Sequence, residues 1–234
     1  MAMKLKDRVA VLTGAGRGIG RAVALAYAQE DASLVLAART TSELEATAAD
    51  VRGLGRPCLA VPCDVAQEDQ VQALVDRALK EFGRIDVLVS NAGVMTSPAP
   101  LAELEIRKWD YTLNVNLRGT FLCARAVLPS MLRQSGGSII TVSSMMGHGI
   151  YPRHGAYVVS KWGVETLTRV LAEEVRGSGV RVNAVDPGVV ATRMTHFSGS
   201  KPESVTGVFL YLASEDSKKV TGQVLSAQEW RRRG

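Results

Sequence analysis

The sequence predicts an α/β protein with a doubly wound parallel sheet and helices on both faces. Short apolar runs alternate with amphipathic helical segments along the chain, and this alternation favours parallel strands joined by helical crossovers. The expected strands are almost continuously apolar, as is typical of strands covered on both faces. A glycine-rich turn follows the first strand directly, which is the usual opening of a doubly wound sheet.

The elements follow in regular order. Residues 8–14 form the first expected strand, 18–30 an amphipathic helix and 33–39 the second strand, which together make one βαβ unit. Further strands are expected at 58–65, 85–93, 137–144, 180–188 and 222–226. Further helices are expected at 41–55, 68–83, about 103–133, around Tyr157 and around 203–214. With right-handed crossovers, ligands should bind at the carboxyl ends of the strands.

Composition indicates one domain, residues 1–234, because no linker interrupts a chain that is 46% hydrophobic. No run of about 18 apolar residues and no signal-peptide pattern are present, so we expect a cytoplasmic protein without a membrane segment. Cys58, Cys63 and Cys123 lack CxxC spacing, which argues against a disulfide or a metal site. The net charge of +5 is scattered apart from the terminal run 231–233, which we interpret as a solvated tail and not as a nucleic-acid site.

The glycine turn is the first candidate binding site. It lies between a strand and a helix, where glycines permit close backbone approach and the helix N-terminus attracts a pyrophosphate. A turn that only reverses the chain is the simpler alternative. The context favours dinucleotide binding by the residues Thr13, Gly14, Gly16, Arg17, Gly18, Ile19 and Gly20.

The end of the second strand indicates which dinucleotide is bound. An acid there would hydrogen-bond the ribose of NAD, whereas an arginine would accept the 2′-phosphate of NADP. This strand ends in Ala38-Arg39 without an acid, and Arg17 lies in the neighbouring turn. Arg39 can also be a solvated charge, but the guanidinium fork suits a phosphate. We therefore predict that NADP(H) is preferred over NAD(H).

Tyr157 and Lys161 are the strongest catalytic candidates. Residues at i and i+4 share a helix face, so the ammonium can lie beside the phenol. A cation within about 4–6 Å favours the phenolate and would lower the tyrosine pKa from about 10 toward neutrality. Such a pair also occurs by chance on helices, where the ring packs and the lysine is solvated, so the interpretation depends on agreement with the rest of the chain.

The ordered motifs resemble those of the short-chain dehydrogenase/reductase family, in particular its single-domain members similar to ketoacyl-carrier-protein reductases. The resemblance spans nearly the whole chain, and it is carried by the glycine turn, Asp64, Asn91-Ala92-Gly93, Asn116, Ser144, Tyr157, Lys161 and Pro187-Gly188.

The resemblance implies a catalytic role for four residues. Tyr157 would be the general acid in reduction and the general base in oxidation, and Ser144 would hydrogen-bond the substrate oxygen. Lys161 would hold the nicotinamide ribose and lower the pKa of Tyr157. Asn116 would anchor a water in a proton relay to Lys161; Asn114 is its rival, and we choose Asn116 because it directly precedes the Leu-x-Gly step.

The resemblance also implies cofactor contacts beyond the glycine turn. Tyr157 and Lys161 would take part in them. The other expected cofactor residues are Arg39, Asp64, Val65, Asn91, Ala92, Gly93, Pro187, Gly188, Val190 and Thr192.

The chain departs from the family pattern in its last third. Only residues 193–201 stand where relatives carry a longer substrate loop, so either the pocket is open or a mobile stretch is missing from the sequence. The ending LSAQEWRRRG replaces the usual Asp-Gly-Gly, which puts the usual subunit packing in doubt. Relatives form oligomers through the helices matching 113–133 and 155–176, so we still expect a homo-oligomer, either a tetramer or a dimer.

Two functional hypotheses follow. The first is an NADP(H)-dependent oxidoreductase that transfers hydride between nicotinamide and a small-molecule carbonyl or secondary alcohol. The alternative is a catalytically idle nucleotide-binding regulatory protein, which the intact Ser144, Tyr157 and Lys161 argue against. His148, His154 and His196 are interpreted as surface or pocket-lining groups without a mechanistic role.

Overall fold

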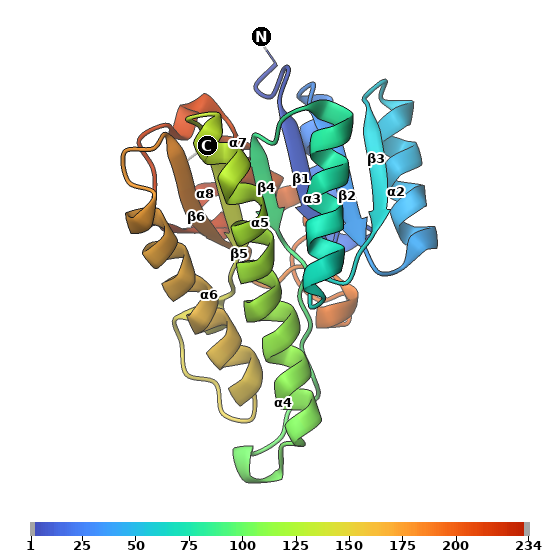
Figure 1. Ribbon diagram of the computed structural model, residues 1–234. Helices are drawn as coiled ribbons and strands as arrows, with labels where there is room; N and C mark the ends of the chain where they lie inside the picture. Colours follow the sequence, from blue (N-terminus) through green and yellow to red (C-terminus); the bar gives the residue numbers. More distant parts are fainter. Residues whose placement is uncertain (1–2, 232–234) are drawn as a thin grey trace.

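The computed structural model describes residues 3–231, in which seven parallel strands form one sheet. The strand order is β3-β2-β1-β4-β5-β6-β7 (Figure 1). The strands are β1 Val9–Thr13, β2 Ser33–Ala38, β3 Cys58–Pro62, β4 Val87–Ser90, β5 Gly137–Val142, β6 Val180–Asp186 and β7 Val224–Ser226. The order reverses beside β1, which pairs with β2 on one side and β4 on the other. The predicted doubly wound parallel sheet is confirmed.

Eight α-helices lie within the described residues. They are α1 Gly18–Gln29, α2 Thr41–Gly53, α3 Glu68–Phe82, α4 Ile106–Leu113, α5 Gly119–Arg133, α6 Gly155–Glu174, α7 Thr206–Ala213 and α8 Ala227–Arg231. Figure 1 shows α3, α5 and α6 in front of the sheet, with α4 and α5 reaching beyond its lower edge. The opposite face carries α1, which packs against both α2 and α7.

The last crossover has the opposite hand to the others. The chain moves from β1 to β2 in one direction and from β6 to β7 in the other, yet α7 packs on the same face as α1. The expected right-handed rule therefore fails once. A long connection, residues 187–205, separates β6 from α7.

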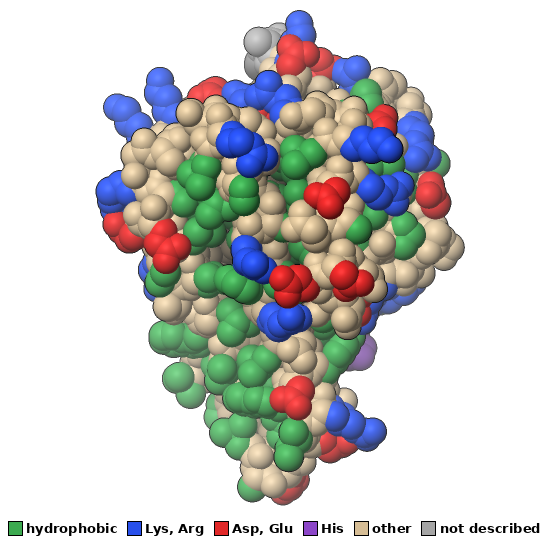
Figure 2. Space-filling view, in the orientation of Figure 1, with side chains coloured by type: hydrophobic (Ala, Val, Ile, Leu, Met, Phe, Trp, Pro, Cys, Tyr) green, Lys and Arg blue, Asp and Glu red, His purple; other side chains and the backbone are tan. Residues whose placement is uncertain are grey.

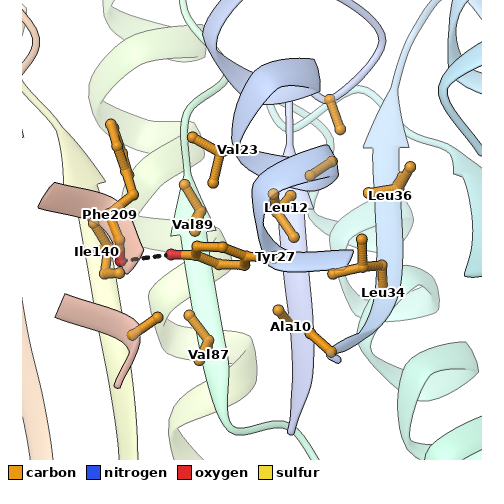
Figure 3. Close-up of a cluster of buried hydrophobic side chains, with 14 of the residues drawn as sticks. Ala10, Leu12, Val23, Tyr27, Leu34, Leu36, Val87, Val89, Ile140 and Phe209 are labelled. Atoms are coloured by element: carbon orange, nitrogen blue, oxygen red, sulfur yellow. Dashed lines mark hydrogen bonds between the residues drawn. The ribbon is translucent and has the colours of Figure 1, made fainter. Parts of the chain in front are cut away.

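Each face of the sheet has its own apolar core. One core joins inward residues of β1, β2, β4 and β5 to α1 and α7, and the other joins the sheet to α3, α5 and α6. Tyr27 is fully buried in the first core and donates a hydrogen bond to the carbonyl of Phe209 at 2.9 Å (Figure 3). This bond satisfies the phenol inside an apolar cluster and connects α1 to α7.

Three details differ from the predicted elements. The long helix expected at about 103–133 is divided into a short turn, α4, a π-helical turn Asn114–Arg118 and α5. Several strands end before the polar residues that the sequence predicts within them, so those residues lie in loops at the carboxyl edge. Helix α8 was not expected; its Trp230 stacks on Tyr211 with ring centroids 4.3 Å apart. The predicted solvated tail at 231–233 falls outside the described side chains.

No helix within residues 3–231 combines the length and the apolar character that a membrane crossing requires.

Candidate active site

A cleft of about 310 Å³ opens at the carboxyl ends of the strands around the point where the strand order reverses. This is where doubly wound sheets bind ligands. Most of the predicted site residues line it, namely Gly14, Gly16, Arg17, Gly18, Ile19, Arg39, Asp64, Val65, Asn91, Ala92, Gly93, Ser144, Tyr157, Lys161, Pro187, Gly188, Val190 and Thr192. Thr13, Gly20 and Asn116 lie behind the cleft wall instead.

The glycine turn joins β1 to α1 in a close-packed arrangement. A Cβ at Gly20 would lie 2.3 Å from the carbonyl oxygen of Gly14 and 2.7 Å from Asn91 Nδ2, so only glycine fits there. Asn91 Nδ2 donates to the carbonyls of Thr13 and Gly14 at 2.9 and 3.2 Å, which fixes the turn against the end of β4. Thr13 Oγ1 accepts the backbone N–H groups of Asn91 and Ala92 at 3.0 and 3.1 Å. Thr13 thus supports the turn from behind.

The N-terminus of α1 faces the cleft without a cap. Its N-cap residue, Arg17, makes no side-chain cap hydrogen bond, and the first turn carries no acidic residue. Backbone N–H groups at such an end carry partial positive charge and attract phosphate. The uncapped helix end and the glycines beside it therefore fit the pyrophosphate of a dinucleotide.

The predicted arginines lie at the cleft and are held by other side chains. Arg17 Nη1 lies 2.8 Å from Glu43 Oε2, and Arg193 Nη1 lies 2.7 Å from Glu43 Oε1. Arg39 Nη1 donates to Tyr111 Oη at 2.9 Å. Glu43, on α2, is therefore an acid between two of the guanidinium groups that could bind a phosphate.

Tyr157 and Lys161 lie on the face of α6 that lines the cleft. Lys161 Nζ lies 5.6 Å from the centroid of the Tyr157 ring and donates to the carbonyl of Val142 at 2.7 Å. Burial lowers the pKa of Lys161 to about 8. The two side chains are thus neighbours, as the helical spacing predicts.

The electrostatic effect on Tyr157 differs from the expectation. Burial raises the pKa of Tyr157 to about 12; the Ser144 hydroxyl opposes this rise, and the charge of Asp186 adds to it. The prediction that Lys161 lowers this pKa toward neutrality is therefore wrong. The reason is that burial removes water from the phenolate, and the neighbouring groups stabilise the charged form less than that water would.

Ser144 stands at the start of a short turn after β5, in extended backbone conformation. Its Oγ accepts the N–H of Met146 at 3.2 Å, which leaves the hydroxyl proton able to donate into the cleft. Met194 lies opposite, with Sδ 4.0 Å from the Tyr157 oxygen. The tyrosine oxygen therefore faces an apolar, polarisable neighbour from the loop after β6.

Asn116 lies in the π-helical turn between α4 and α5 and is 1% exposed. Its Oδ1 accepts the N–H of Val94 at 2.7 Å, and Nδ2 donates to the Val94 carbonyl at 2.9 Å and to Ser160 Oγ at 3.0 Å. Asn114 is exposed, so the burial supports the choice of Asn116 over Asn114. A Cβ on Gly93 would lie 3.4 Å from Asn116 Oδ1 and 3.7 Å from Lys161 Nζ, so both side chains lie beside Gly93.

The short loop after β6 folds back on itself. Ser200 N donates to the Val189 carbonyl at 2.9 Å, and Ala191 N donates to the Ser200 carbonyl at 2.8 Å. A Cβ on Gly18 would lie 3.0 Å from Thr192 Cγ2, so the loop packs against the glycine turn. The loop is a compact turn at the mouth of the cleft.

Several residues at the site are not among those that the sequence predicts. Glu43 and Arg193 form ion pairs at the cleft, and Asp186 Oδ1 accepts the N–H of Gly188 at 2.8 Å. Burial raises the pKa of Asp186. Glu165 is buried beside Ser143; its i+4 spacing from Lys161 was a usable signal, because both residues fall on the same helix face.

Comparisons with known proteins agree with this geometry. The family model described as short chain dehydrogenase matches residues 8–203. The 3-oxoacyl-acyl-carrier-protein reductase of Thermotoga maritima is 37% identical, with 95% of this chain and 97% of the relative covered. D-threitol dehydrogenase of Mycolicibacterium smegmatis is 38% identical, with 94% and 90% covered. The crystal structure of carveol dehydrogenase from Mycobacterium avium in complex with NAD superposes with a TM-score of 0.91 at 29% identity, with 95% and 96% covered.

Three observations indicate the same family. The family model covers most of the chain, and the relatives align over nearly their full length. The cleft also contains the expected side chains. The chain belongs to the short-chain dehydrogenase/reductase family and is an NAD(P)-dependent oxidoreductase that acts on CH–OH or C=O groups of small molecules.

Proposed function

We propose that this protein is an NADP(H)-dependent carbonyl reductase or alcohol dehydrogenase in which Tyr157 is the general acid and base. The observation that carries the proposal is the placement of Ser144, Tyr157 and Lys161 in one cleft beside an uncapped helix N-terminus. When bound, the nicotinamide would supply or accept the hydride.

The residues of the chain would handle the substrate oxygen. During reduction negative charge develops on that oxygen, and donors already in place stabilise it. The Ser144 hydroxyl would donate one hydrogen bond, and the Tyr157 phenol would donate a hydrogen bond and then its proton. With its pKa raised to about 12, Tyr157 keeps its proton at neutral pH, which suits the role of acid.

Lys161 would serve the cofactor and the proton path. Its ammonium group would hold the nicotinamide ribose hydroxyls, and Asn116 would hold a water in a relay that returns a proton to it. The position of both side chains beside Gly93 supports this assignment. No observation favours the idle nucleotide-binding alternative, because the three proposed proton-handling side chains all reach the cleft.

Preference for NADP(H) is supported by two arginines. Arg17 and Arg39 line the cleft, and β2 ends without an acid that would bind a ribose 2′-hydroxyl. A guanidinium group can bind the 2′-phosphate through two parallel hydrogen bonds. Glu43 pairs with Arg17, so phosphate binding would have to replace that ion pair.

An oligomer is proposed from the apolar surface of two helices. Phe121 and Leu132 on α5 and Val159, Trp162 and Val170 on α6 are each more than two-fifths exposed. Figure 2 shows apolar side chains gathered over the lower part of these helices. Exposed apolar patches of this kind mark interaction surfaces. Trp162→Glu should shift the mass measured by light scattering toward the monomer, and an unchanged mass would contradict this interface.

The reaction itself is tested with a substrate panel. Ketones, aldehydes, quinones and ketoacyl thioesters are assayed by the loss of NADPH absorbance, and the best substrate is repeated with NADH. We expect turnover of at least one carbonyl compound with a higher kcat/KM for NADPH than for NADH. Equal kcat/KM values for the two cofactors would contradict the NADP preference, and no turnover of any carbonyl or alcohol would contradict the proposed function. The single domain of residues 1–234 and the cytoplasmic location remain predictions.

A further inference from the structure

Glu165 is a buried acid on α6 that the proposed proton chemistry does not use. It lies one helical turn beyond Lys161 and two turns beyond Tyr157, and it is 3% exposed. A carboxylate in such a position requires hydrogen-bond partners, because burying an unpaired charge is costly. Its partners therefore indicate what it holds in place.

The partners of Glu165 lie at both ends of the segment that carries Ser144. Glu165 Oε1 accepts the hydroxyl of Ser143 at 2.7 Å and lies 3.1 Å from His148 Nδ1. A Cβ on Gly147 would lie 2.6 Å from the same oxygen, so the backbone packs directly against the carboxylate. One oxygen thus binds the segment on either side of Ser144.

The second carboxylate oxygen adds little to this attachment. Glu165 Oε2 lies 3.4 Å from Arg169 Nη2, and the Arg169 side chain is 57% exposed. An ion pair with an exposed partner contributes little to stability. The short contacts of Glu165 are therefore those with the segment 143–148.

Ser144 and Tyr157 belong to different elements, yet both have to meet one substrate oxygen. Ser144 lies in the turn after β5, whereas Tyr157 and Lys161 are on α6. Glu165 is on the same helix as Tyr157 and is bonded to the residue directly before Ser144. It is a direct cross-link between the element that carries one donor and the element that carries the other.

We propose that Glu165 is a positioning residue that holds Ser144 in place relative to Tyr157 by binding Ser143 and His148. The proposal rests on the proposed function, because it concerns the two donors of that reaction. A displacement of about 1 Å at a reacting group can lower the rate about 100-fold. The attachment should consequently affect kcat more than cofactor binding.

Three variants test the attachment. Glu165→Gln keeps an oxygen acceptor for Ser143 and should keep kcat within about threefold of the wild type, because a neutral acceptor still accepts the hydroxyl. Glu165→Ala removes the acceptor and should lower kcat about 10- to 100-fold with an unchanged NADPH dissociation constant. His148→Ala, at a half-exposed site, removes one contact and should have a smaller effect. Glu174→Ala, an exposed change on the same helix, is the control and should have none.

A double-mutant cycle separates positioning from a general structural role. If Glu165 acts through Ser144, Glu165→Ala should cause little further loss of kcat in a Ser144→Ala background. A full loss in both backgrounds would overturn the proposal. So would wild-type kcat in a folded Glu165→Ala protein.

Hydrogen exchange provides a readout that needs no substrate. Glu165→Ala should speed amide exchange in residues 143–148, whereas Glu165→Gln and Glu174→Ala should leave it as in the wild type. Unchanged exchange in Glu165→Ala would overturn the attachment even if the enzyme is active. Failure of the proposed function would instead appear as a wild-type protein that turns over no carbonyl or alcohol, which the exchange experiment does not depend on.

Discussion

Replacing Lys161 with Met should make the ligand-free protein more stable at neutral pH. Lys161 is 4% exposed, and burial lowers its pKa from 10.5 to about 8. At about 1.36 kcal/mol per pKa unit, this fall means that the buried charge destabilises the fold by about 3 kcal/mol at pH 7. Met has a similar length and no charge, so it removes this penalty.

The replacement also removes one hydrogen bond. Lys161 donates to the Val142 carbonyl at 2.7 Å, and the net loss of a hydrogen bond from a charged donor is about 2 kcal/mol. The expected gain is therefore about 1 kcal/mol, which for a chain of this size raises Tm by about 2–4 °C.

The stability difference between Lys161→Met and the wild type should depend on pH in a defined direction. Between pH 8 and 10.5 the unfolded chain keeps the Lys161 proton while the folded protein has lost it, so wild-type stability rises with pH across this window. The advantage of Lys161→Met over the wild type should therefore disappear between pH 8 and 10.5. Thermal unfolding of the ligand-free proteins at pH 7 and at pH 10.5 measures this difference.

Lys219→Met is the matched control, because Lys219 is exposed and should show no gain at either pH. A Lys161→Met protein that is less stable than the wild type at pH 7 would refute the reasoning. An advantage that persists unchanged at pH 10.5 would refute it as well, since the gain would then not come from the buried charge.

Two further predictions concern the cofactor end of the cleft. Glu43→Gln frees Arg17 and Arg193 from ion pairs of about 0.2–1 kcal/mol each. In a fluorescence titration, NADPH should therefore bind about 2- to 10-fold more tightly, while NADH binding stays constant. Glu45→Gln is the control, and an equal gain for both cofactors would contradict a role of these arginines in binding the phosphate. Gly20→Ala places a Cβ 2.3 Å from the Gly14 carbonyl, so it should lower the free energy of unfolding by about 1–3 kcal/mol and weaken NADPH binding. Gly53→Ala is the control, because a Cβ there has no atom within 4 Å, and it should do neither. Normal NADPH binding by Gly20→Ala would show that the turn is not the phosphate site.

The sequence predicted the sheet and most of the site because those features are local. The apolar strands, the glycine turn and the i, i+4 spacing of Tyr157 and Lys161 each depend on residues close together in the chain. Parallel strands then bring their carboxyl ends together at one edge. The position of the cleft could therefore be predicted from the order of the elements.

The features that the sequence did not predict depend on distant contacts. The ion pairs of Glu43 join α2 to the glycine turn and to the loop after β6, and nothing local indicates either partner. The π-helical turn at Asn116 has no composition signal, because the surrounding residues suit an ordinary helix. The rise in the Tyr157 pKa came from burial, which the helical spacing of the pair does not reveal.

Turnover by Tyr157→Phe tests the central claim most directly. This change removes the phenol hydroxyl and keeps the aromatic ring, so NADPH binding should remain as in the wild type. Loss of a positioned general acid should lower kcat by about 100- to 10,000-fold on every accepted substrate. If Tyr157→Phe keeps wild-type turnover on any accepted substrate, Tyr157 is not the proton donor and the proposed mechanism is wrong.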